Sequence, residues 1–119
     1  MIKQLKKLLD QYDTCSNLEC DGMTRVIHYV LTKNQIDHRI YYGSIRLKEK
    51  EMNTHFWIEI QNLIIDYRAK MWIPEVIEHG VFEKNKTNVE YIGNKINIQI
   101  LPEFLFEILT NKKTMEKNR

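Results

Sequence analysis

The feature that most constrains the fold is a pair of short segments between residues 54 and 68. Both carry the β-branched and aromatic residues that strands prefer, and Gln61-Asn62 between them predicts a tight turn. Side chains of a strand point alternately to its two faces. With a two-residue turn at Gln61-Asn62 or one step either side, every antiparallel register joins an odd-numbered residue to an even-numbered one. His55 and Asp66 are therefore expected on one face, where a carboxylate can hold an imidazole in one tautomer.

Size and charge narrow the class of protein. The 119 residues suffice for one domain, and 43% hydrophobic with 29% charged residues is typical of a globular chain. A net charge of +2 is too small to indicate nucleic acid or an anionic membrane as the main partner. No apolar run is long enough to span a bilayer, and the N-terminus lacks the pattern of a signal peptide. We therefore expect a cytoplasmic protein.

Two helices are predicted in the first third of the chain. Apolar residues at helical spacing indicate an amphipathic helix over about residues 2–12. A capping box at Ser16–Glu19 predicts a second helix from about residue 17 to near Asn34. Cys20 then lies in or just after its first turn, on the buried face. The helix dipole lowers the pKa of a thiol placed there, and the thiolate is the nucleophile.

The other cysteine and the histidines outside the hairpin carry weaker signals. Cys15 is expected to be a small buried hydrophobic residue. A zinc site at the spacing of the two cysteines needs two further clustered ligands, and the sequence shows none, so we expect no metal and no cofactor. His28 is interpreted as a helix-surface residue and His38 as the start of a strand.

The remaining segments predict an α+β domain over residues 1–110, with N-terminal helices packed on an antiparallel sheet. The expected elements are a strand over 38–47, a charged turn over 48–53, a short helix before Gly80 in the segment 75–86, a second hairpin over 88–100 turning at Gly93-Asn94, and a helix after Pro102. The apolar face of that last helix is predicted to be Phe104, Leu105, Ile108 and Leu109. Residues 111–119 form a polar, basic tail that we expect to be disordered.

A cysteine that opens a buried helix, followed by a strand and then by a hairpin with His and Asp on one face, resembles the transglutaminase-like superfamily of cysteine enzymes. The resemblance covers about residues 18–68. It is carried by Cys20-Asp-Gly, by Gln35-Ile-Asp-His-Arg-Ile-Tyr-Tyr-Gly-Ser-Ile, by His55-Phe-Trp-Ile-Glu59 and by Asp66. The family pattern is a helix-capping Cys, a His-x-Trp-x-Glu strand and an Asp soon afterwards, and this chain fills the three positions in order. The chain is much smaller than most active members, and it has no room for the additional domains that define their substrates.

The resemblance implies roles for three residues: Cys20 as nucleophile, His55 as general base and acid, and Asp66 as the group that orients His55. A Cys–His pair can attack an amide carbonyl to form an acyl-enzyme, which water or an amine then releases. The oxyanion is expected to be held by the Cys20 backbone N–H and one upstream donor, with Asn17, Gln11 or Tyr12 as the choices.

The remaining polar and aromatic residues near this pattern are expected to be structural. Trp57 is predicted to be a core or pocket-wall residue, and Glu59 to form an ion pair with Arg68 or Arg39. His79 is expected in a surface turn, with a place in the site as the alternative.

Three functions stay open at this point. The first is a peptidase or amidase, or an acyltransferase, that acts on a peptide, a protein or a small amide; hydrolysis is favoured over crosslinking because so small a domain offers little to exclude water. The second is a catalytically inactive module that keeps the fold to bind a peptide or protein partner. The third, nucleic-acid binding through the basic tail and N-terminal lysines, is disfavoured by the low net charge.

Overall fold

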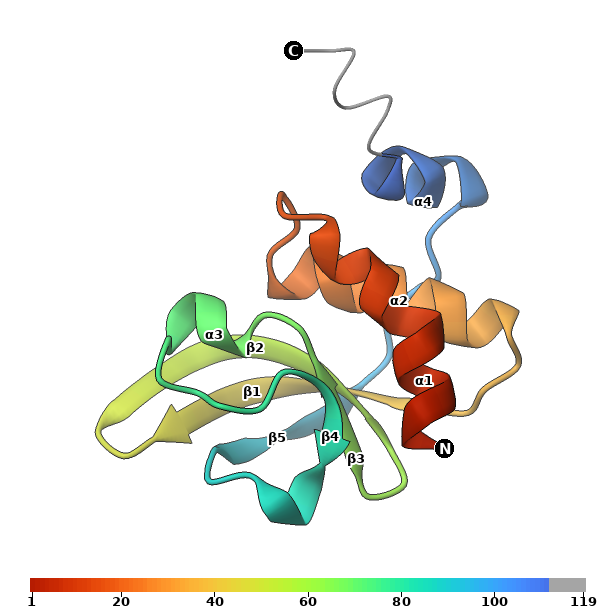
Figure 1. Ribbon diagram of the computed structural model, residues 1–119. Coiled ribbons are helices and arrows are strands. Elements are labelled where there is room, and N and C mark those ends of the chain that lie inside the picture. The colour runs from red at the N-terminus through yellow and green to blue at the C-terminus, as the bar shows by residue number, and fades with distance from the viewer. Residues whose placement is uncertain (112–119) are drawn as a thin grey trace.

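Residues 1–111 are described by the computed structural model, in which the two N-terminal helices cover one side of a curved antiparallel sheet (Figure 1). The elements are α1 (Ile2–Leu9), α2 (Cys20–Lys33), β1 (Arg39–Leu47), β2 (Lys50–Ile60), β3 (Leu63–Asp66), α3 (Ala69–Trp72), β4 (Gly80–Glu83), β5 (Glu90–Ile96) and α4 (Glu103–Thr110), with 3-10 turns at Asp10–Thr14 and Lys84–Lys86. The predicted α+β class is confirmed. The tail expected beyond Asn111 lies outside the described residues. None of the helices in residues 1–111 has the length and apolar character needed to cross a bilayer.

The central hairpin forms in the predicted register. Ile60 pairs with Leu63, so the turn consists of Gln61 and Asn62, and Gln61 has a φ of 53°. The charged turn predicted over 48–53 is shorter in the structure. It consists of Lys48-Glu49 alone, because β2 already begins at Lys50. A strand of 11 residues can extend through this polar segment because β1 supplies its backbone partners on one side.

The predicted second hairpin is wrong. β5 runs straight through Gly93-Asn94 and pairs antiparallel with β1, with Gly43 opposite Gly93. A Cβ on Gly93 would come within 2.6 Å of the Tyr42 carbonyl oxygen and 2.8 Å of the Trp57 ring. The glycine therefore serves close packing between strands, and not a turn.

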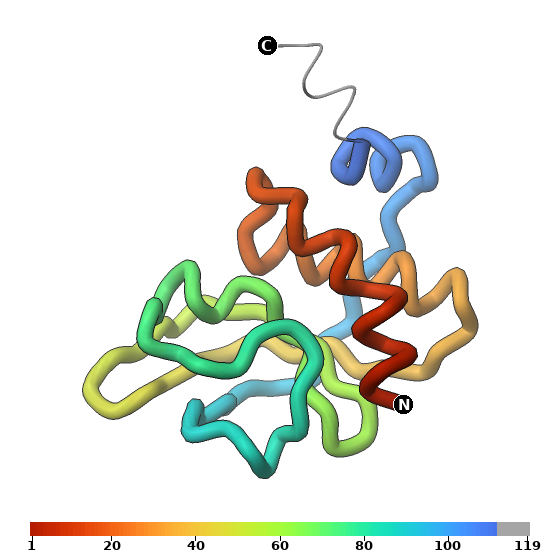
Figure 2. The backbone as a smooth tube through the Cα atoms, viewed as in Figure 1, coloured from red at the N-terminus to blue at the C-terminus, as the bar shows by residue number. Residues whose placement is uncertain are grey.

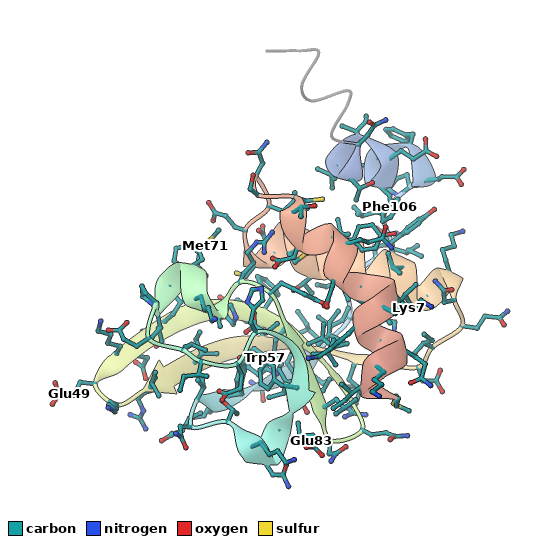
Figure 3. The ribbon with its side chains drawn as sticks, viewed as in Figure 1. Lys7, Glu49, Trp57, Met71, Glu83 and Phe106 are labelled. Atoms are coloured by element: carbon teal, nitrogen blue, oxygen red, sulfur yellow. The ribbon has the colours of Figure 1, made fainter. Side chains whose placement is uncertain are left out.

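The sheet, in the order β4-β3-β2-β1-β5 within residues 1–111, curls so that side chains of its two edge strands meet. Phe82 of β4 and Tyr91 of β5 have ring centroids 6.3 Å apart. Tyr91 also contacts the ring of Trp57, which Figure 3 labels inside the sheet. The opposite side packs against α1 and α2 in the main hydrophobic core. A second, smaller core of Ile45, Ala69, Ile73, Val76 and Val89 lies beneath α3.

Helix α2 begins at Cys20, three residues later than predicted, and the capping box at Ser16 is not formed, because Glu19 is the N-cap residue. The preceding loop folds back in tight turns, with the Leu18 amide bonded to the Cys15 carbonyl. The carbonyls of Cys15 and Leu18 both accept hydrogen bonds from the Arg68 guanidinium. These tertiary bonds hold residues 15–18 outside the helix.

Two short helices also differ from the prediction. The short helix expected before Gly80 is absent from residues 75–79, and α3 comes earlier, directly after the central hairpin. In α4 the predicted face is partly wrong, because Phe104 and Ile108 are exposed. Phe106 points toward α2 (Figure 3) and stacks on Tyr29 at 4.1 Å between ring centroids.

His28 is half-buried, contrary to its interpretation as a surface residue. Its Nδ1 lies 2.7 Å from Nε2 of His38, and its Nε2 donates to the Ile98 carbonyl at 3.0 Å. His38 Nδ1 donates to the Ile36 carbonyl. Burial, and then the adjacent His38, lower the pKa of His28. The bond from His28 to Ile98 fastens α2 to the segment that leads from β5 to α4. Figure 2 shows the backbone of that segment passing α2.

Candidate active site

Cys20 occupies the first position of α2, where backbone N–H groups lack partners within the helix. Its Sγ contacts the carbonyl oxygen of Thr54 at 3.9 Å, and Thr54 directly precedes His55 in β2. The side chain is 6% exposed at an open cleft of about 580 Å³. The cleft is lined by Glu19, Cys20, Asp21, Tyr42, Met52, Thr54, Phe56, Trp72 and Ile96. A substrate carbonyl in this cleft would meet the sulfur at the positive end of the helix dipole.

His55 and Asp66 form a buried pair, as the hairpin register predicts. His55 Nε2 lies 2.7 Å from Asp66 Oδ2, and both side chains are shielded from solvent. A carboxylate accepts only, so Nε2 carries the proton and Nδ1 is the nitrogen left for chemistry. Within residues 1–111, Nδ1 makes no hydrogen bond of ordinary geometry, and the Cys20 thiol is close enough to influence the ring.

The charge of His55 is set by its neighbours. Burial lowers the pKa of this imidazole, but the Asp66 carboxylate and the adjacent Cys20 thiol raise it, with a net result of about 9. The imidazolium is therefore the favoured form at neutral pH. In general, a positive ring favours the reactive thiolate form of a neighbouring cysteine.

Asp66 is held from two further directions. The backbone N–H of Arg68 donates to Oδ1 and the Tyr91 hydroxyl donates to Oδ2, each at 2.9 Å. Burial, and then the Asp66 carboxylate, raise the pKa of the Tyr91 phenol, so it remains a donor. Sequence reasoning missed Tyr91, because β5 was expected to fold as a hairpin. No local signal indicates that a residue of β5 reaches β3.

Arg68 anchors the loop before the cysteine, a role that sequence reasoning missed. Its guanidinium donates to the carbonyl of Leu18 at 2.6 Å, to that of Cys15 at 3.0 Å and to Asp13 Oδ1 at 2.7 Å. His79 bonds the other oxygen of Asp13 at 2.7 Å. Burial raises the pKa of Asp13, yet the bonds from His79 and Arg68 bring it below its ordinary value. His79 therefore fastens the loop from a half-exposed position and does not line the cleft.

The other predicted neighbours have structural positions. Trp57 is fully buried and donates from Nε1 to Glu59 at 3.0 Å. Glu59 pairs with Arg39 at 3.9 Å and with Lys84 at 3.3 Å; Arg68, the alternative partner, is engaged in the loop.

Gln11, Tyr12 and Asn17 are the three residues that the sequence offers as an upstream oxyanion donor. Gln11 donates to the Leu8 carbonyl and Tyr12 packs against Phe106, so both are engaged elsewhere, while Asn17 is exposed. Cys15 is buried in the main core, as predicted.

Comparisons of the chain with protein-family models, with curated proteins and with solved structures found no match. Among residues 1–111, no three or more His, Cys, Asp or Glu side chains are grouped so that they could hold a metal ion. The chemistry of the site therefore has to be inferred from its own geometry.

Proposed function

We propose that this chain is a cysteine hydrolase or acyltransferase of the transglutaminase-like type, acting on an amide-type bond through Cys20, His55 and Asp66. The observation that supports it best is the orientation of His55. One ring nitrogen is tied to Asp66, while the other lacks a partner and the adjacent Cys20 helps to raise the pKa of the ring. A structural histidine has no need of this arrangement, whereas a thiolate–imidazolium pair does.

The chemistry follows from these positions. The Cys20 thiolate attacks the carbonyl carbon, and the oxyanion accepts a hydrogen bond from the backbone N–H of Cys20. Collapse of this intermediate breaks the C–N bond, and His55 Nδ1–H protonates the departing amine. Water then attacks the thioester while Nδ1 takes its proton, which releases the carboxylic acid and the Cys20 sulfur. An amine in place of water gives acyl transfer. We favour peptidase or amidase activity over crosslinking, because the cleft is open.

The test is the rate of iodoacetamide alkylation as a function of pH, with each modified cysteine located by mass spectrometry. Cys15 is the matched internal control, because it is 7% exposed and Cys20 is 6% exposed. We expect Cys20 to react well below the ordinary thiol pKa of about 8.5 and faster than Cys15. In His55→Ala this advantage should disappear while the rate of Cys15 stays the same.

Two outcomes separate the alternatives. A Cys20 that reacts no faster than a simple thiol and is insensitive to His55→Ala would favour the binding module that keeps the fold without catalysis. If Cys20 is activated, products formed with and without an added primary amine distinguish hydrolysis from acyl transfer, since only a transferase incorporates the amine.

A further inference from the structure

The cleft at Cys20 combines apolar and acidic side chains. Its apolar wall includes residues of three neighbouring strands: Tyr42, Met52, Phe56 and Ile96. The residues on either side of the cysteine also line it, and both are acidic: Glu19 and Asp21. None of the nine described residues that line the cleft is Lys, Arg or His. The cleft therefore carries two negative charges, although the chain as a whole has a net charge of +2.

The two carboxylates differ in what they contribute to the fold. Asp21 lies in the first turn of α2, where a negative charge is favoured by the helix dipole, and its Oδ1 accepts a hydrogen bond from the Gly22 backbone at 2.8 Å. Glu19 is the N-cap residue, but its side chain is exposed and makes no capping hydrogen bond. The stability of the helix therefore accounts for Asp21 more fully than for Glu19.

The proposed chemistry does not require these carboxylates either. A negative charge close to a cysteine disfavours its thiolate, the form that attacks a carbonyl. The thiolate–imidazolium pair is neutral as a whole, so it does not balance the charges of Glu19 and Asp21. A cation bound in the cleft would balance them.

The apolar wall is complementary to the stem of such a cation. Tyr42 and Phe56 are cross-strand partners with ring centroids 4.7 Å apart, and Tyr42 is 38% exposed. Lys and Arg side chains bury an aliphatic stem on apolar surface while the charged head stays near water, and aromatic faces attract the cation itself. A basic side chain therefore matches both the apolar and the acidic part of the lining.

We infer that the cleft selects an acyl group with a positively charged side chain, and that Glu19 and Asp21 determine this specificity. The inference rests on the proposed function and names its substrate class, a peptide in which Lys or Arg supplies the scissile carbonyl. That residue stays bonded to the Cys20 sulfur in the acyl-enzyme, so its side chain has to lie in the cleft that Cys20 lines. The stem packs on Tyr42 and Phe56, and the charge lies near the two carboxylates.

The test uses reagents that differ in charge but attach to a thiol by one reaction. The thiolate attacks the sulfenyl sulfur of a methanethiosulfonate, a disulfide forms, and methanesulfinate leaves. We compare the cationic trimethylammonium-ethyl, the anionic sulfonatoethyl and the neutral methyl reagents, and follow Cys20 and Cys15 separately by mass spectrometry. Division of each charged rate by the neutral rate removes any change in the reactivity of the thiol itself.

We expect the cationic reagent to modify Cys20 about 100-fold faster than the anionic one, and Glu19→Gln and Asp21→Asn each to lower this ratio about tenfold, as for a carboxylate roughly 6 Å from the reagent charge in water. Raising the ionic strength from about 0.01 M to about 1 M shortens the screening length from about 30 Å to about 3 Å, so the ratio should approach one. Glu107→Gln is the matched control, because it removes an exposed carboxylate of α4 that does not line the cleft, and it should leave the ratio unchanged.

A second measurement uses substrates. The p-nitrophenyl esters of N-acetyl-lysine and N-acetyl-norleucine differ mainly in the terminal ammonium group. We expect the burst of p-nitrophenol from acylation of Cys20 to be about tenfold faster or more with the lysine ester, and Glu19→Gln to remove most of that difference. Cys20→Ala gives the background rate of each ester.

The outcomes separate this inference from the proposed function. If Cys20 is activated by His55 but reacts equally with the cationic and anionic reagents, the specificity is overturned and the proposed function stands. A ratio that persists in the double variant Glu19→Gln/Asp21→Asn overturns the role of the two carboxylates. If Cys20 of the unmodified protein is not alkylated faster than Cys15, the proposed function fails, and this inference fails with it whatever the ratio of the charged reagents.

Discussion

At the scale of single residues, the charge buried in the sheet is concentrated in one short segment. The buried charged side chains of residues 1–111 are His55, Glu59, Asp66 and Arg68. Taking charges out of water is costly unless each is paired, and such pairs seldom contribute net stability. A domain of this size has little stability to spare. We interpret the concentration of charge as a requirement of the site.

The interaction between His55 and Asp66 should make stability depend on pH. The pKa of His55 is raised from its ordinary 6.5 to about 9, so its contribution is fully present below about pH 6.5 and is lost as pH rises through about 9. A shift of this size corresponds to roughly 3 kcal/mol. Urea unfolding of the unmodified protein and of Asp66→Asn should differ most near pH 6 and much less near pH 10.

The direction can be checked on the histidine itself. In Asp66→Asn the burial that lowers the pKa of His55 remains, while the carboxylate that raises it is gone. An NMR titration should therefore place the pKa of His55 well below its value in the unmodified protein. A stability difference that is constant from pH 6 to pH 10 would contradict the assignment of the ion pair.

At the scale of elements, the start of α2 depends on a residue from the other end of the site. The guanidinium of Arg68 bonds the backbone of the loop that leads to Cys20 at several points. Lysine has the same charge but lacks the planar fork that reaches separate acceptors. The loop therefore needs arginine itself, and not merely a positive charge.

Arg68→Lys should lower the free energy of unfolding by about 2 kcal/mol, because buried carbonyls lose their donors. It should also slow alkylation of Cys20, since the sulfur is then held less firmly. Arg46→Lys is the control: its ion pair with Glu90 at 3.2 Å is exposed, and its loss should change stability by less than about 1 kcal/mol. Equal effects of the two substitutions on Cys20 would show that Arg68 does not position it.

At the scale of the whole molecule, the curl of the sheet brings distant strands to one site. Tyr91 of β5 reaches Asp66 of β3, although β1 and β2 lie between those strands in the sheet. The ring of Tyr91 also packs against Trp57, with centroids 5.1 Å apart. Gly43 of β1 lies opposite Gly93 of β5, so the two strands approach closely where the sheet curves.

Gly93→Ala should disturb that closure. The added Cβ would meet a backbone oxygen at 2.6 Å and the Trp57 ring at 2.8 Å, so one of them must move. We expect a loss of about 1–3 kcal/mol in the free energy of unfolding, together with altered Trp57 fluorescence. Gly22→Ala in α2 is the control for adding a methyl group at a glycine. Its Cβ would meet the flexible Leu18 side chain at 3.2 Å, and not backbone. An unchanged stability in Gly93→Ala would mean that the strands can separate at little cost.

The sequence predicts an element of this fold well where that element is set by residues that are neighbours in the chain. The amphipathic first helix, the end of α2, and β1 follow from residues that are neighbours in the chain, and they are found close to their predicted bounds. The hairpin predicted at Gly93-Asn94 failed because the same dipeptide that favours a turn also permits two strands to approach closely. The start of α2 was misplaced because a distant arginine outcompetes the capping box.

The sequence by itself determined the central hairpin and placed His55 and Asp66 on one face, because every register that a two-residue turn near Gln61-Asn62 allows joins an odd-numbered residue to an even-numbered one. Only the tertiary structure decided that Cys20 lies beside Thr54, that Tyr91 and Arg68 hold Asp66, and that Trp72 shares the cleft. Those contacts join residues far apart in the chain. The packing of helices on a curled sheet creates them, and no local pattern encodes them.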